Sequence, residues 1–149
     1  MTKARKSSIA TNHAAIKATE PVAVSRGQTL GPVPAGSYLA GFPSHRTLDG
    51  VNIRVTAAGP RTRADGRKVH VFPIRPFHDI HGQVLVCMPG DPADEPIIYR
   101  LPRTVCAEYD RIVIDPQNPG ELGAYRWSPE TRQERRQRAY FDEHAWDLA

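Results

Sequence analysis

Cysteine is scarce in this sequence, and the surroundings of the two cysteines narrow the class of protein. Cys87 and Cys106 lie nineteen residues apart in apolar stretches, and the sequence has no C-x-x-C pair. Zinc knuckles and disulfide frameworks need more ligand or bridging residues at characteristic spacings. Both classes are therefore disfavoured, and we expect two buried free thiols in a reducing compartment.

Long apolar runs and the common hydrolase motifs are also missing. No window approaches the roughly eighteen apolar residues that would span a membrane, and residues 1–21 contain no apolar run long enough for a secretion signal. There is no Walker loop, no G-x-S-x-G and no glycine-rich dinucleotide turn. We therefore expect a cytoplasmic protein that needs no cofactor and belongs to none of these enzyme classes.

Proline and glycine, in contrast, are abundant. The chain has 149 residues, of which 14 are proline and 11 are glycine, and 40% are hydrophobic. This composition supports one modest core and short, interrupted strands. We predict a mainly β, α+β fold: a small antiparallel barrel or bent sheet of five to seven short strands, with a C-terminal helix and a disordered N-terminal tail. The expected divisions are a flexible tail over 1–27, a β-rich domain over 28–127 and a helix over 128–149.

Apolar alternation places the strands. Val51, Ile53 and Val55 alternate with polar residues, which predicts a half-buried strand. Val69 and Val71 repeat the alternation until Pro73 interrupts it, and residues 83–88 are apolar on both faces, which predicts a central strand. The predicted strands cover residues 36–42, 51–57, 68–75, 83–88, 97–101 and 111–115.

The stretch between two of these strands carries the strongest local charge. Asp65-Gly66 is the dipeptide that a two-residue type I′ turn prefers, and this turn would pair Ala64 with Arg67 and Arg63 with Lys68. The tip of the hairpin would then present basic side chains that can contact phosphates. The alternative is an edge hairpin that its charge protects from pairing with other sheets. The basic residues of this hairpin are Arg61, Arg63, Arg67 and Lys68.

The net charge of +4 equals the contribution of residues 1–30, which hold five basic residues and one acidic residue. A basic tail with little to bury is typical of a flexible tether for nucleic acid, or of a solubilising leader. Within it, Lys3, Arg5 and Lys6 are the candidate phosphate contacts.

The C-terminal segment has a different composition. Ser128 at the N-cap, followed by Pro129, predicts a helix over 129–147. Arg132, Arg135 and Arg136 would form a basic stripe on it. Further along, Tyr140, Phe141 and Trp146 are candidate anchors for a protein partner.

A histidine group offers the remaining chemistry. His78, Asp79 and His81 are close in sequence, and with His70 they supply residue types that a metal site or a nuclease could use. The spacing gathers them only if the chain turns at this point. The sequence commits us to no metal site and no catalytic residue.

These observations favour a binding protein over an enzyme. The first hypothesis is a protein that contacts the phosphates of nucleic acid, or of a nucleoprotein assembly, through the basic hairpin, the tail and the arginines of the helix. The second is a structural or inhibitory protein that docks on a partner protein, or on itself, through its tail and C-terminal helix. The third is a small nuclease built around His70, His78, Asp79 and His81.

Overall fold

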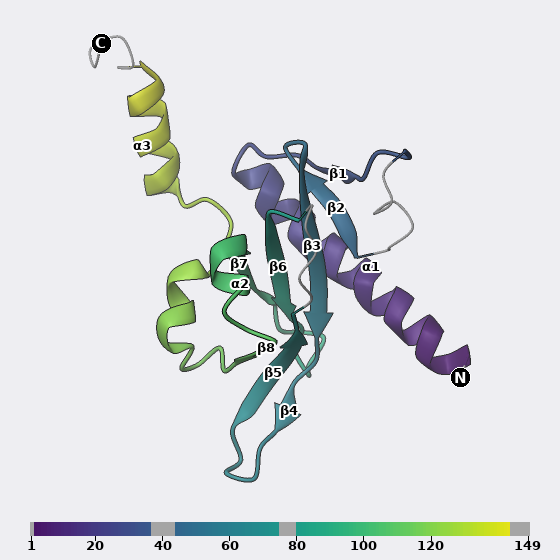
Figure 1. Ribbon diagram of the computed structural model, residues 1–149. Coiled ribbons are helices and arrows are strands. Elements are labelled where there is room, and N and C mark those ends of the chain that lie inside the picture. Colours follow the sequence, from purple (N-terminus) through teal and green to yellow (C-terminus); the bar gives the residue numbers. More distant parts are fainter. Residues whose placement is uncertain (1, 37–43, 75–79, 144–149) are drawn as a thin grey trace.

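A computed structural model describes residues 2–36, 44–74 and 80–143 as a helix-covered open sheet with a second, smaller sheet beneath it (Figure 1). The first sheet has the strand order β1-β2-β3-β6-β7, and the second has the order β4-β5-β8. The strands are β1 (Leu30–Pro32), β2 (His45–Leu48), β3 (Val51–Ala58), β4 (Arg61–Thr62), β5 (Lys68–Pro73), β6 (Gly82–Cys87), β7 (Ile97–Pro102) and β8 (Arg111–Ile114). The helices are α1 (Thr2–Ser25), α2 (Arg103–Cys106), the 3-10 turn η2 (Gly120–Tyr125) and α3 (Arg132–Glu143).

The predicted α+β class is confirmed in its bent-sheet form. Over the described residues neither sheet closes into a barrel, because β1 and β7 remain the edges of the larger one. Its strands pair antiparallel except for β3 and β6, which run parallel. A parallel pair needs a crossover connection, and here residues 59–81 supply it. The β4–β5 hairpin lies in this connection.

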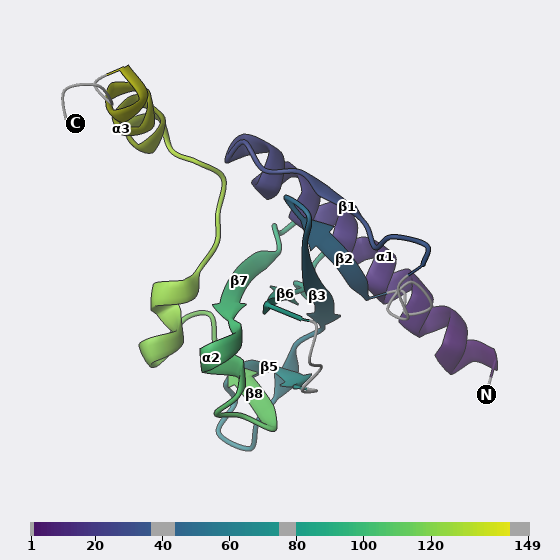
Figure 2. The ribbon, with the colours of Figure 1, turned by 45° about the horizontal axis from the view of Figure 1, so that its top comes forward.

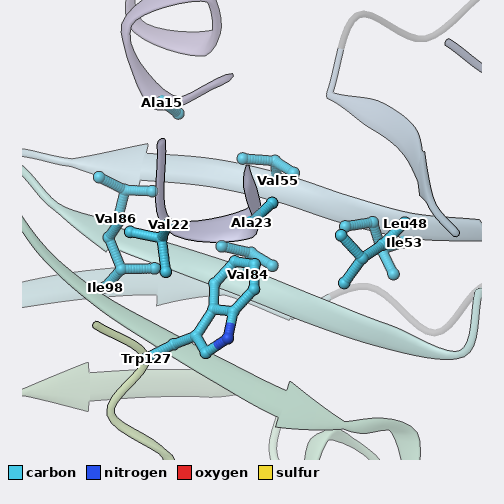
Figure 3. Packing of buried hydrophobic residues seen from close by; sticks show 10 residues of the cluster. All are labelled: Ala15, Val22, Ala23, Leu48, Ile53, Val55, Val84, Val86, Ile98 and Trp127. Carbon is cyan, nitrogen blue, oxygen red and sulfur yellow. The ribbon is translucent and has the colours of Figure 1, made fainter. Parts of the chain in front are cut away.

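One face of the larger sheet is covered by α1, as Figure 3 shows. The small side chains of Ala15 and Ala23 are fully buried, and Val22 is nearly so. They pack against Val55, Val84, Val86, Ile98 and Trp127. Because these helix residues are small, the helix can lie close to the strands, and burial of the apolar strand surface then stabilises the pair.

The opposite face holds a second core. Leu85 and Cys87 of β6 pack there with Phe72 of β5, Tyr99 of β7 and Ile112 of β8. All six residues of β6 are buried, because α1 covers one face of this strand and the second sheet covers the other. The prediction that residues 83–88 form a central strand is confirmed.

The N-terminal segment differs from the predicted flexible tail. Residues 2–25 form α1, and over residues 13–25 the helix is anchored in the first core. Ala15, Thr19, Val22 and Ala23 recur at intervals of four, three and one, so they form one stripe of the helix. The hydroxyl of the buried Thr19 donates to the carbonyl oxygen of Ala15 at 2.7 Å, which removes its need for solvent.

Other local differences follow from contacts distant in sequence. Strands β1 and β2 and the short helix α2 were not predicted, and the predicted strand over 36–42 lies almost wholly outside the described residues. In β5, Phe72 belongs to the second core, and it lies on the same face of the strand as His70. This face packs in the second core, whereas the face of Val69 and Val71 does not. Val69 is nonetheless buried, since both faces of β5 are partly covered.

The C-terminal helix is confirmed but begins at Arg132, later than predicted. The hydroxyl of Thr131 accepts from the N–H of Glu134 at 3.1 Å, and the carboxylate of Glu134 accepts from the N–H of Thr131 at 3.4 Å. This is a capping box. Its hydrogen bonds from Thr131 hold the pKa of Glu134 below its usual value. Ser128 lies before the helix, and its carbonyl oxygen accepts from Nε of Arg26 at 2.7 Å.

The two cysteines are free and buried, as predicted. Burial raises the pKa of Cys87 to about 12, and burial likewise raises the pKa of Cys106. Because the thiolate is the reactive form, we expect neither thiol to react with DTNB in the native protein at pH 8, and both to react in denaturant. Rapid release of one equivalent of thionitrobenzoate from the native protein would contradict this burial.

Candidate nucleic-acid interface

The β4–β5 hairpin projects from one end of the molecule, and its turn differs from the predicted one (Figure 1). Arg61 pairs with Val69 and Thr62 with Lys68. The N–H of Arg63 donates to the carbonyl oxygen of Arg67 at 2.8 Å, so the loop has three residues, 64–66. Gly66 ends it in the left-handed region at φ 83°, where glycine meets no steric penalty. The predicted two-residue register is therefore wrong by one residue.

The shift of register by one residue changes which side chains share a face of the hairpin. Directly opposed residues of an antiparallel pair lie on the same face, and so do residues two apart along a strand. Arg61, Arg63 and Arg67 therefore lie on one face of the hairpin, whereas Lys68 lies on the other face with His70. The two-residue turn would instead have separated Arg67 from the other two arginines. We call Arg61, Arg63 and Arg67 the arginine face.

The arginine face is solvent-exposed, and one of its members is held in place. Arg61, Arg63 and Arg67 are all exposed. Nη2 of Arg67 lies 3.2 Å from the carboxylate of Asp115, whose side chain is only 16% exposed. Arg61 and Arg63 form no ion pair with any other described residue. Two guanidinium groups are thus available to an external anion, and the third is oriented beside them.

The other face of the hairpin borders a concave surface of opposite character. A cavity of about 1300 Å³ lies between the hairpin and the loop that follows β6. Four aspartates line it, against two basic residues. Arg67 and Asp115 are the ion pair of the arginine face, so the surplus negative charge of the cavity itself comes from Asp91 and Asp94. Phosphate is therefore less favoured in the cavity than beside Arg61 and Arg63. The charged residues of the cavity are Asp65, Arg67, Lys68, Asp91, Asp94 and Asp115.

The other predicted phosphate contacts lie elsewhere. Figures 1 and 2 show α3 projecting from the end of the molecule opposite the hairpin, and α1 pointing away from both. Arg132, Arg135 and Arg136 are exposed on α3. Lys3, Arg5 and Lys6 belong to the first turns of α1, of which the structure describes the backbone only. The three basic regions therefore do not form one surface.

The predicted partner anchors are only partly described. Tyr140 is 58% exposed on α3. The side chain of Phe141 and the whole of Trp146 lie outside the described residues. Docking through α3 stays a prediction. The tail cannot serve this purpose as a free segment, because residues 13–25 already pack on the sheet.

The histidine group is not assembled into a site by the residues that are described. His70 is buried, and its Nδ1 lies 2.8 Å from the carbonyl oxygen of Ala58. His81 is exposed, and His78 and Asp79 lie outside the described residues. No group of three or more potential metal ligands occurs in the part of the chain that can be described.

A row of polar side chains that sequence reasoning missed crosses the sheet on the face opposite α1. His45, Arg54 and Gln83 are aligned across β2, β3 and β6. Burial, and then the charge of Arg54, lower the pKa of His45, which favours its neutral imidazole. The strict alternation of residues 51–57 suggested that Arg54 faces solvent. Only the pairing with strands far away in sequence shows that it is half-buried.

Comparisons with known proteins assign no family. No family model and no curated protein matches the sequence. Among solved structures, the chain is similar to I-Ssp6803I, described as a bacterial homing endonuclease, at 17% identity and a TM-score of 0.49 over 90% of this chain and 96% of the other. A likeness of this degree assigns neither an ancestry nor an activity. Within the described residues no helix is long and apolar enough to cross a membrane.

Proposed function

We propose that this protein binds nucleic acid through the arginine face of the β4–β5 hairpin. The observation that carries the proposal is the placement of Arg61, Arg63 and Arg67 on one exposed face of a projecting hairpin. Guanidinium groups pair with phosphate in bidentate geometry, and such contacts are largely independent of base sequence. The role is one of binding, and no reaction is assigned to these residues.

The charges around the hairpin favour approach of a polyanion from the side of the arginine face. Because Asp91 and Asp94 line the cavity on the Lys68 side, a polyanion is less favoured there than beside Arg61 and Arg63. The ion pair with Asp115 orients Arg67 but also offsets part of its charge, so the stronger attraction for phosphate comes from Arg61 and Arg63. Contacts of this kind give dissociation constants of roughly 10⁻⁴ to 10⁻⁶ M at physiological salt.

A matched pair of double substitutions tests the location. Fluorescence anisotropy with labelled single- and double-stranded DNA and RNA would compare the Arg61→Ser/Arg63→Ser protein with the Arg132→Ser/Arg135→Ser protein. Both remove two exposed positive charges. We expect the hairpin variant to bind at least tenfold more weakly than the wild type, since two phosphate contacts are lost. The α3 variant should change the affinity much less.

Two outcomes would count against the proposal. Equal losses for the two variants would mean that only net charge matters, and no binding by the wild type at low salt would remove nucleic acid as the partner. Thermal unfolding of each variant provides the folding control. Substitutions at exposed positions of this kind usually change the unfolding free energy by less than about 0.5 kcal/mol.

A further inference from the structure

A second concave site lies on the α1 face of the sheet, beyond the point where α1 ends. It is a cavity of about 420 Å³, which is within the range typical of small-molecule sites. Its floor is apolar and formed by Leu48, Ile53 and Val84, which are buried members of the first core. Charged and polar side chains, namely Gln28, Asp49, His81 and Arg100, stand around this floor.

Arg100 is held in position on one side of the cavity. Its guanidinium carbon lies 5.3 Å from the ring centroid of Trp127, which is a cation–π geometry. Its Nη1 donates to Oε1 of Gln28 at 3.3 Å. A guanidinium group has five N–H donors, so these contacts leave several for an anion. The group is preorganised, which lowers the entropic cost of binding.

Asp49 is fixed on the other side. It occupies the first position of the two-residue turn between β2 and β3 with φ 49°, in the left-handed region, and Gly50 follows at φ 81°. Its carboxylate accepts from the N–H of Thr29 at 2.8 Å, and its own N–H donates to the carbonyl oxygen of Thr29 at 2.9 Å. This reciprocal pair holds the acidic group at the rim of the cavity.

The spacing of these two charges limits the ligand. Arg100 belongs to β7, and Asp49 lies in the turn before β3, which is two strands away from β7 in the sheet. Arg100 is level with Val84 and Val55, so at about 3.3 Å per residue and about 4.8 Å per strand its backbone lies roughly 20 Å from that of Asp49. The long side chain of Arg100 reaches back to Gln28, and Asp49 accepts from the next residue, Thr29, so the two charged groups stand roughly 10 Å apart across an apolar floor. An amino acid, whose ammonium and carboxylate groups are joined through a single carbon, cannot reach both. The ligand must be longer, flat or apolar in its middle, and anionic at one end.

We propose that this cavity binds one nucleotide, with its phosphate at Arg100, its base on the floor of Leu48, Ile53 and Val84, and an amino group of the base donating to Asp49. A carboxylate selects bases with N–H₂ donors. Adenosine, cytidine and guanosine monophosphates should therefore bind more tightly than uridine monophosphate. The nucleotide is either free or the 5′-phosphorylated end of a strand. The site shares no residue with the arginine face and does not rest on it.

Isothermal titration calorimetry of the full chain with the four nucleoside monophosphates tests this site. The wild type should bind adenosine monophosphate at least tenfold more tightly than uridine monophosphate. Arg100→Met should weaken adenosine monophosphate binding at least tenfold, whereas Arg111→Met, at an exposed position outside the cavity, should leave it unchanged. Asp49→Asn keeps a side chain that tolerates the left-handed region, and it should remove the preference over uridine monophosphate.

The control variants separate this proposal from the hairpin. Arg61→Ser/Arg63→Ser should leave adenosine monophosphate binding unchanged. Competition by a 5′-phosphorylated oligonucleotide but not by its 5′-hydroxyl form would identify a strand end as the ligand, and competition by neither would identify the free nucleotide. No heat of binding at millimolar nucleotide, or equal binding by the wild type and a folded Arg100→Met protein, would overturn the proposal.

Discussion

Replacing Ala23 with aspartate is expected to lower the free energy of unfolding by about 3–5 kcal/mol, because an unpaired carboxylate would be placed in the first core. Ala23 is fully buried between α1 and the sheet, beside Val55 and Val84 (Figure 3). Domains of this size are stable by only about 5–15 kcal/mol. The loss would therefore leave little of the native stability, although the residue lies in a segment whose composition resembles a disordered tail.

The neighbouring residue provides the matched control. Val24 is 64% exposed, so Val24→Asp should change the unfolding free energy by less than about 0.5 kcal/mol. Urea unfolding followed by circular dichroism would measure both variants. Similar losses at the two positions would contradict the docking of α1. Because α1 covers the first core, removing residues 1–27 would expose that core as well as remove the basic residues. Loss of nucleic-acid binding by such a shortened protein would therefore not show that the basic residues act as a tether.

Phe72→Ala is expected to cost a similar amount, about 3–5 kcal/mol, through a different core. Phe72 is 1% exposed and packs among Leu85, Tyr99 and Ile112. Its removal leaves a cavity where β5 meets the larger sheet. Because β5 also carries one side of the hairpin, this substitution should loosen the support of the arginine face as well.

Val71→Ala, on the same strand, is the appropriate comparison. Val71 lies on the other face of β5 and is only half-buried, so its truncation should cost clearly less than that of Phe72. The urea midpoints of the two proteins show which face of β5 contributes more to the packing. A larger loss for Val71→Ala would mean that the Val69 and Val71 face carries the packing, as the alternation of the sequence suggested.

Patterns that depend on near neighbours in sequence predicted the structure well. The two-sided apolar run of β6 and the alternation of Ile53 and Val55 are local signals, and both strands form as expected. The packing of α1 on the sheet could not be recognised from apolar content, because its buried stripe consists of alanine, threonine and valine. Its helical periodicity was a readable signal. Pro21 within the helix and the absence of an acidic first turn obscured it.

The two Asp-Gly turns show which features of the candidate site short sequence patterns cannot predict. Asp49-Gly50 forms the two-residue connection, with both residues left-handed, whereas Asp65-Gly66 forms part of a three-residue loop. The same dipeptide suits either turn, so the pairing of the flanking strands decides between them. Pairing of β5 with β8 also brings Asp115 beside Arg67. The identity of the four basic residues was predictable, but not the face that each occupies.

The salt dependence of nucleic-acid binding tests the proposed function most directly. Each phosphate contact with duplex DNA contributes about 0.9 to the slope of log K against log salt. If Arg61, Arg63 and Arg67 contact phosphates, the slope for a protein with all three changed to serine should be shallower than that of the wild type by about 2–3. Parallel lines for the two proteins would show that the arginine face does not touch the nucleic acid, whatever the affinities at any single salt concentration.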